Sequence, residues 1–152
     1  MDRIVGLQRG LKAVAQEVAM RFARWVFRIA GIYGIVLLTP FYFLEKQIGA
    51  ATVPIAHPEY FYGFVGTALS AQILFLIISM DPVRFRPAMV ACVIEKLAFG
   101  IPVWMLWSMS RVGMDVVSFG SVDLIWAALF TIVYFRLGRT NAGGWGTPRA
   151  PT

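Results

Sequence analysis

The chain has 152 residues, of which 59% are hydrophobic, and its formal net charge is +6. Soluble domains contain only about 45–50% apolar residues, so this composition indicates a membrane protein. The length leaves room for one helical bundle and for no separate soluble domain. The basic residues lie beside the ends of apolar segments and do not alternate with aromatic residues on a polar face. This placement excludes nucleic acid as a partner.

The first 25 residues have the pattern of a basic amphipathic helix. Apolar residues recur at steps of three and four from Ile4 to Phe22. The basic residues lie mostly on the other faces: Arg3, Arg9, Lys12, Arg21 and Arg24. This pattern is typical of a helix in the membrane interface that contacts anionic lipids. A partner-binding helix and a mitochondrial presequence are the alternatives, although Asp2 and Glu17 argue against the presequence.

Four apolar segments follow, and each is long enough to cross a bilayer. A hydrocarbon core of about 30 Å needs about 20 apolar residues in a helix. The segments cover residues 26–44, 60–80, 87–109 and 116–135. Thr39-Pro40 is expected to kink the first of them, because proline removes a helical hydrogen bond. We therefore predict an all-α fold: an interfacial helix over 1–25, a four-helix transmembrane bundle over 26–136 and a flexible tail over 137–152.

Lysine and arginine are distributed unequally between the two ends of these spans. Eleven lie at the termini and in the link between the second and third spans: Arg3, Arg9, Lys12, Arg21, Arg24, Arg28, Arg84, Arg86, Arg136, Arg139 and Arg149. Only Lys46 and Arg111 lie at the opposite ends. Because cytoplasmic segments carry the excess of Lys and Arg, we expect both termini and the link to be cytoplasmic.

Ionisable residues inside the spans are the strongest indication of a functional site. A charge at the bilayer centre costs about 2.5–3.5 kcal/mol on insertion scales, so it needs a partner or a role. Glu95 and Lys96 are adjacent and point about 100° apart on a helix, so we expect them not to satisfy each other. Lys96 and Asp123 come to similar depths on consecutive antiparallel helices and are expected to form an ion pair. Tyr33 and Gln72 reach nearly the same depth and are candidates to bond Glu95, which completes one polar layer.

This polar layer has two interpretations that the sequence leaves open. It either fixes helix pairing and register, or it forms a proton path, an ion site or a site for a quinone headgroup. A weaker candidate is an outer-side cluster of Glu45, His57, Glu59 and Asp115, for which helix capping and solvated loop charge are the alternative. His57 is the only histidine and Cys92 the only cysteine, so a bis-histidine haem and a zinc site lack ligands within the chain. No catalytic residue, metal or cofactor is predicted; contact with a quinone or a lipid stays open.

Four segments support a family resemblance: HPEYFYGFVG at 57–66, DPVRFRP at 81–87, EKLAFG at 95–100 and FGSVDLIW at 119–126. Together they resemble small bacterial inner-membrane proteins of the DoxX-like four-helix group, over about residues 29–136. The resemblance implies a bacterial inner-membrane bundle with polar residues at its helix junctions. It transfers no catalytic residue to this chain.

These observations favour a non-catalytic accessory or assembly subunit of a larger membrane complex, such as a respiratory or photosynthetic one. The reasons are the absent cofactor ligands, the two termini suited to partner contacts, and small-residue pairs such as Ala30/Gly34 and Gly63/Thr67 that allow helices to approach closely. Its partners would be the bilayer and other membrane subunits. The alternatives are a small transporter or channel that uses Glu95, Lys96 and Asp123, and a quinone- or redox-associated protein.

Overall fold

A computed structural model describes residues 2–52 and 54–141 of the chain. The described residues form helices and no strand, which confirms the predicted all-α bundle. In chain order the helices are α1 (Asp2–Leu38), α2 (Phe41–Ala51), α3 (Pro58–Met80), the 3₁₀ helix η1 (Arg86–Ala88), α4 (Met89–Ser108) and α5 (Met114–Asn141).

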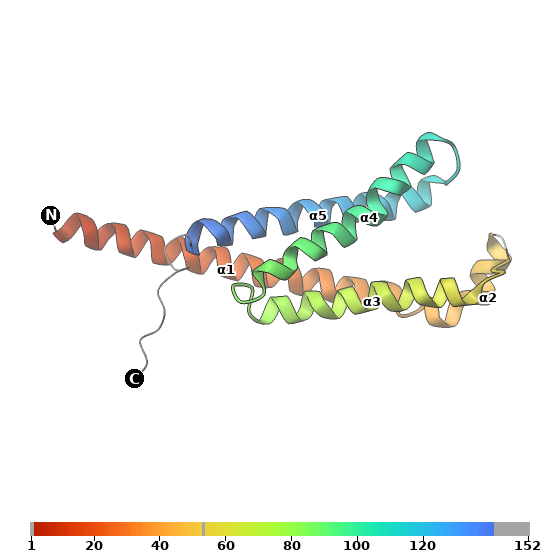
Figure 1. Cartoon of the computed structure of the whole chain (residues 1–152), viewed down its shortest axis with the longest axis horizontal. Helices are drawn as coiled ribbons and strands as arrows, with labels where there is room; N and C mark the ends of the chain where they lie inside the picture. Colours follow the sequence, from red (N-terminus) through yellow and green to blue (C-terminus); the bar gives the residue numbers. More distant parts are fainter. Residues whose placement is uncertain (1, 53, 142–152) are drawn as a thin grey trace.

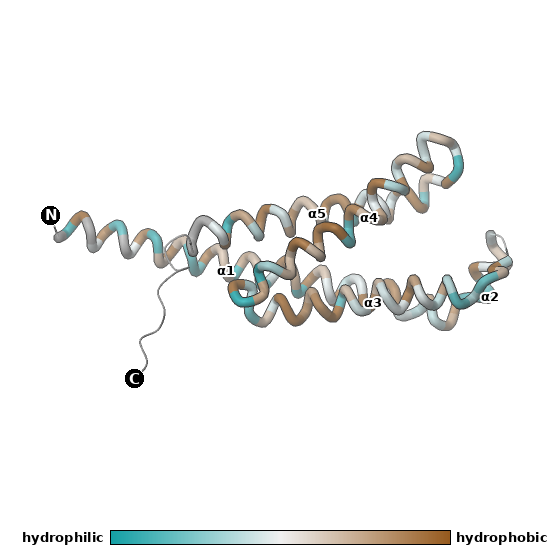
Figure 2. Tube along the Cα trace, in the orientation of Figure 1, coloured by the Kyte–Doolittle hydropathy of each residue, from teal (hydrophilic) through white to brown (hydrophobic). Residues whose placement is uncertain are grey.

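Three helical segments are long and apolar enough to cross a membrane: Pro58–Met80, Arg86–Ser108 and Met114–Gly138. A fourth crossing exists if the bent pair Gly6–Leu38 and Phe41–Ala51 forms one span. Figure 2 shows hydrophobic residues along the middle of these helices and hydrophilic ones near their ends. Because only 22–28% of the residues in the three apolar windows are buried, most of their apolar surface faces outward, as a lipid environment requires. The chain is a multi-pass membrane protein.

The predicted kink at Thr39-Pro40 is confirmed. α1 ends at Leu38, α2 begins at Phe41, and their axes differ by 56°. Proline has no N–H to donate and its ring clashes with the preceding turn, so the helix cannot run straight through this point. The Ile35 carbonyl oxygen accepts hydrogen bonds from both the hydroxyl and the backbone N–H of Thr39, at 2.7 and 3.0 Å.

α1 is one unbroken helix of 37 residues, and no break separates the predicted interfacial helix from the first span at residue 25. The reason is local, because no proline or glycine lies between Lys12 and Ala30 to end a helix there. At the other end, α5 continues to Asn141, so the predicted tail begins later than residue 137. The rest of that tail, residues 142–152, lies outside the described residues.

The helices are arranged as two antiparallel pairs that cross (Figure 1). α1 packs along α3, and α4 packs along α5. The pairs meet chiefly through α1 and α5, whereas α3 and α4 contact each other little. Toward the end of the molecule that holds α2 and the α4–α5 loop, the two pairs diverge. The N-terminal part of α1 extends alone beyond the opposite end.

The crossing point contains a dense aromatic core. Phe27 of α1 stacks on Phe130 of α5 with ring centroids 4.3 Å apart, and Phe75 of α3 meets Phe130 edge-on at 4.9 Å. All three rings are fully buried, as are Ile78 and Met89. Since three helices each contribute one ring, this core holds the two pairs together.

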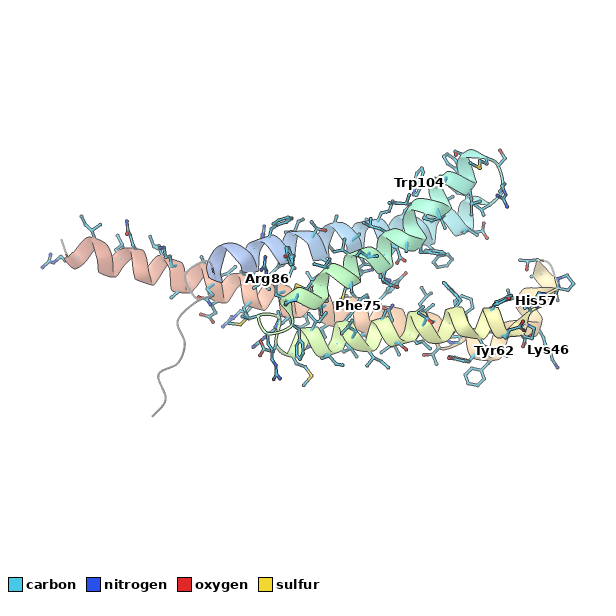
Figure 3. All side chains as sticks on the ribbon, in the orientation of Figure 1. Lys46, His57, Tyr62, Phe75, Arg86 and Trp104 are labelled. Carbon is cyan, nitrogen blue, oxygen red and sulfur yellow. The ribbon has the colours of Figure 1, made fainter. Side chains whose placement is uncertain are left out.

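Arg86, in the link between α3 and α4, contacts the C-terminal half of α5 (Figure 3). Its Nε donates to the Tyr134 carbonyl oxygen at 3.0 Å, and its guanidinium lies 4.0 Å from the centroid of the Tyr134 ring. The N-terminus, this link and the end of α5 therefore lie toward one end of the molecule, and α2 and the α4–α5 loop toward the other. This arrangement matches the predicted separation of the basic residues, and the side of the membrane that each end faces stays a prediction.

Candidate functional site

A cavity of about 180 Å³ lies between the two helix pairs, and all five residues of the predicted polar layer line it. Its polar lining consists of Tyr33, Gln72, Glu95, Lys96, Asp123 and Trp126. The remaining wall is apolar and comes from α1, α2, α3, α4 and α5: Ala30, Gly34, Leu37, Leu38, Phe41, Phe64, Ala68, Phe99 and Phe119. An apolar hollow with a few convergent polar groups is the usual form of a small-molecule site.

Lys96 lies between two carboxylates in this cavity. Its Nζ is 3.2 Å from Asp123 Oδ1 and 3.3 Å from Glu95 Oε2. The lysine side chain is only 8% exposed, and those of Asp123 and Glu95 are 18% and 30% exposed. The predicted Lys96–Asp123 ion pair is therefore present. Because water is largely excluded from both groups, breaking this pair would leave an uncompensated charge.

The expectation that Glu95 and Lys96 do not meet is wrong. Adjacent Cα–Cβ bonds do diverge on a helix, but both side chains are long enough to bend toward the same cavity, and their charged ends meet there. Lys96 Nζ also lies 5.4 Å from the centroid of the buried Phe75 ring. The cation is thus held by two carboxylates and one aromatic ring from the dense core.

Tyr33 and Gln72 line the cavity without forming the predicted hydrogen bonds to Glu95. The Gln72 Nε2 donates instead to the Ala68 carbonyl oxygen of its own helix, at 3.0 Å. Within the described residues, Glu95 Oε2 and Trp126 Nε1 are buried and have no hydrogen-bond partner. Oε2 contacts the lysine ammonium at ion-pair distance, but without the alignment of a hydrogen bond. The other oxygen, Glu95 Oε1, accepts a hydrogen bond from Lys96 Nζ at 3.5 Å. Within the described residues the cavity lining therefore includes one acceptor and one donor without a hydrogen bond.

Close helix contact brings the charged residues of α4 and α5 together. A Cβ added at Gly100 would lie 3.0 Å from the Gly120 carbonyl oxygen and 2.7 Å from a Leu124 methyl group. Gly100 is one turn from Lys96, and Gly120 is about one turn from Asp123. The two glycines allow the helices to approach, and this approach sets Lys96 opposite Asp123.

On the other pair, Gly31 and Gly34 of α1 have the same role. A Cβ at Gly34 would overlap the Gln72 side chain, and one at Gly31 would lie 2.9 Å from the Gln72 carbonyl oxygen. The Ala30/Gly34 pair thus lies at a close helix crossing, as predicted. Gly63 has no atom within 4 Å of an added Cβ, so the Gly63/Thr67 pair does not lie at one.

The outer-side cluster is divided between separate contacts. His57 Nδ1 lies 2.9 Å from Glu59 Oε1, and the Tyr62 hydroxyl donates to Glu45 Oε2 at 2.7 Å. Asp115 is exposed at the start of α5, on the other helix pair. Figure 3 shows His57 and Tyr62 on one diverging arm. Among the described residues no three His, Cys, Asp or Glu side chains gather as metal ligands would.

The predicted basic helix presents its cations to the exterior. Arg3, Lys12, Arg21 and Arg24 are exposed, and Arg21 forms an ion pair with Glu17 at 2.7 Å. The side chain of Arg9 lies outside the described part of the chain. Exposed cations of this kind fit contact with acidic lipids or an acidic protein surface.

Sequence reasoning missed the aromatic wall of the cavity. Phe119, Asp123 and Trp126 recur at steps of four and three, so all three lie on one face of α5. This spacing links the aromatic residues to the charged one and could have identified them. Phe41, Phe64 and Phe99 carry no comparable signal, because they join the wall only through helix packing.

Comparisons of the chain with protein-family models, with curated proteins and with solved structures find no match. The resemblance to the DoxX-like group therefore stays a prediction, and the function has to be inferred from the geometry.

Proposed function

We propose that this protein is a non-catalytic accessory subunit that attaches to a larger membrane complex along α1. The observation that carries this proposal is a stripe of large apolar side chains that follows the outer face of α1 and continues past the end of the bundle. The stripe consists of Ile4, Leu7, Leu11, Val14, Val18, Trp25, Ile29, Ile32 and Val36, all of which are exposed.

The spacing of the stripe favours a partner helix. From Ile4 to Val18 the steps alternate between three and four residues, which is the heptad spacing of a helix that packs along another helix. Leu7 and Leu11 are 66% and 62% exposed, so nothing in the described part of the chain covers them. In proteins most of the stability of an amphipathic helix comes from tertiary packing of its apolar face.

The continuity of α1 indicates that the stripe contacts a protein partner and does not lie on the membrane surface. A helix that crosses the bilayer needs about 20 residues to do so. α1 has 37 residues and no break, so its N-terminal part continues along the axis of the part that packs against α3. Lying flat on the membrane would require a bend between Val18 and Val26, where the sequence has no helix breaker.

Mild-detergent extraction followed by native-gel mass spectrometry tests the proposal. We expect the protein to migrate in an assembly with other membrane subunits. A double change of Leu7→Glu and Leu11→Glu places charge in the stripe and should release the protein from that assembly. Met80→Glu is the matched control, because Met80 is 72% exposed on another helix. Migration of the unaltered protein as a monomer or a homo-oligomer would refute the proposal.

We further propose that the membrane is the bacterial inner membrane and that both termini face the cytoplasm. The resemblance to the DoxX-like group supports the bacterial inner membrane. The charge asymmetry supports the orientation, because the N-terminal part of α1, the α3–α4 link and the end of α5 lie toward one end of the fold. Reporter fusions after residues 50, 83, 113 and 140 should lie outside, inside, outside and inside. A cytoplasmic signal at residue 50 would overturn this topology.

A small transporter or channel is the second candidate, and the meeting of Glu95, Lys96 and Asp123 in one cavity favours it. Under this function Glu95→Gln, which keeps shape and loses charge, should abolish flux in proteoliposomes at unchanged protein level. Glu59→Gln, at an exposed site outside the cavity, is the control. Equal flux in the wild type and the Glu95 variant would exclude this use of the site.

A further inference from the structure

Two carboxyl groups and one amine meet in the cavity. With the three groups in their ordinary ionised forms, the carboxylates of Glu95 and Asp123 surround the single ammonium of Lys96, which leaves one negative charge in excess. Among the described residues, no other cationic side chain lines the cavity. An excess charge inside a membrane protein is costly, so a cation that enters the cavity would be attracted to it.

Glu95 keeps one unused acceptor atom. Its Oε1 accepts a hydrogen bond from Lys96 Nζ at 3.5 Å, whereas its Oε2 is buried and accepts none within the described part of the chain. At 30%, the Glu95 side chain is also the most exposed of the three. It is therefore the group that a donor on an entering molecule would reach. A charged N–H donor beside this carboxylate would supply the missing positive charge.

Aromatic rings from several helices line the same cavity as this carboxylate. Tyr33 and Trp126 lie with ring centroids 6.3 Å apart, and Phe64 and Phe99 at the same distance. All four rings and Phe119 line the cavity. The faces of aromatic rings attract cations, most strongly where water is excluded, and rings grouped around a carboxylate suit an ammonium group better than an anion.

The size of the cavity limits what enters. Its volume is about 180 Å³, compared with about 150 Å³ for an engineered cavity that holds benzene. A headgroup with a few carbon atoms fits, and a long chain does not. The cavity lies between the two helix pairs, which diverge toward one end and contact each other little through α3 and α4. A hydrocarbon chain attached to the headgroup would leave through this side and remain in the lipid.

We propose that the cavity binds a cationic amphiphile: an ammonium headgroup beside Glu95, enclosed by the aromatic wall, on a hydrocarbon chain that stays in the bilayer. The proposal adds a ligand class that the accessory-subunit function does not require. Binding is also independent of transport, so a protein that transports nothing would still bind the amphiphile.

Titrations of the purified full-length protein in nanodiscs of neutral lipid test the proposal. The probes are dodecylamine, which is cationic at pH 7, and two matched molecules of the same chain length, dodecanol and laurate. Binding is measured by isothermal titration calorimetry and by the rise in melting temperature, after subtraction of empty nanodiscs. We expect the amine to bind on the order of tenfold more tightly than the alcohol, and the carboxylate not to bind. Equal binding of amine and alcohol, or tighter binding of laurate, would overturn the proposal.

Two variants locate the binding. Glu95→Gln should lower the affinity for the amine on the order of tenfold and leave that for the alcohol unchanged, whereas Glu59→Gln at an exposed site should change neither. Phe119→Leu removes one ring of the wall from a position that is 47% exposed, so it should fold normally and still weaken the amine. If the amine binds both cavity variants as tightly as the wild type, it binds elsewhere and the proposal is wrong.

Discussion

The half of the bundle around the aromatic core, here the dense half, and the half around the cavity, here the open half, are built from the same helices but packed differently. Where α1 and α5 cross, Phe27, Phe75 and Phe130 interlock and are fully buried. One or two turns further along, the same helices line a cavity that contains the ionisable side chains of Glu95, Lys96 and Asp123. In the dense half the contacts join the two pairs; in the open half the glycine contacts lie within each pair. Stability is therefore concentrated on one side of Lys96, and space for a ligand on the other.

The largest effect is expected at the boundary between the two halves, from breaking the Lys96–Asp123 pair. Lys96→Met leaves two half-buried carboxylates without a cation, and Asp123→Leu removes one of the two carboxylates that hold the lysine. Lys96→Met should cost about 3–5 kcal/mol at the upper end, measured as loss of folding in a detergent titration. Asp123→Leu should cost less, because Lys96 keeps Glu95 as a partner. The double change should recover part of the loss. Additive losses would mean that the two residues are energetically independent, despite the 3.2 Å between their charged atoms.

The aromatic core gives the direct comparison of the two halves. Phe130→Ala removes a ring that is 0% exposed and touches two other rings, so it should destabilise the protein by about 3–5 kcal/mol. Phe64→Ala makes the same chemical change at a cavity-lining residue that is 55% exposed, and it should cost far less. Melting temperatures of both variants in one detergent measure the difference. Equal losses would show that the cavity wall is as tightly packed as the core.

Two glycine-to-alanine substitutions compare a close helix contact with an open position, and their expected effects on the free energy of unfolding are smaller. Gly31→Ala places a methyl group 2.9 Å from the Gln72 carbonyl oxygen between α1 and α3, so it should cost about 1–3 kcal/mol. Gly63→Ala meets no atom within 4 Å and gains helix propensity, so it should be neutral or stabilising by up to about 1 kcal/mol. Equilibrium unfolding of both variants checks the sign. A stabilising Gly31→Ala would mean that α1 and α3 can separate there without cost.

Glu95→Gln should have the smallest effect on stability. It keeps the shape and an acceptor oxygen, and it leaves Lys96 paired with Asp123. We expect the free energy of unfolding to fall by far less than the about 3–5 kcal/mol expected for Lys96→Met. The melting temperature should therefore be nearly unchanged. This variant therefore separates binding from folding at the open half. A severe loss of folded protein would instead make Glu95 part of the structural core.

The sequence alone determined the all-α class, the apolar helical segments, the kink at Pro40 and the matched depths of Lys96 and Asp123. Each of these follows from local composition, from residue geometry or from the length of a helix against a bilayer. The amphipathic pattern suggested a boundary at residue 25. The sequence nevertheless contains no residue nearby that ends a helix, so the continuity of α1 could also have been predicted. What a pattern of apolar spacing cannot supply is the angle between helices.

Only the tertiary structure decided how the polar residues meet. Depth placed Tyr33, Gln72 and Glu95 in one layer, but the Gln72 amide bonds its own helix and the carboxylate of Glu95 bends to Lys96. Side-chain length and rotamer choose between such partners, and both depend on the space that neighbouring helices leave. That space is set by the crossing of the two pairs and by the few glycines that admit close contact. The same crossing adds Phe41, Phe64 and Phe99 to the aromatic wall from other helices, and no local pattern could have predicted these three.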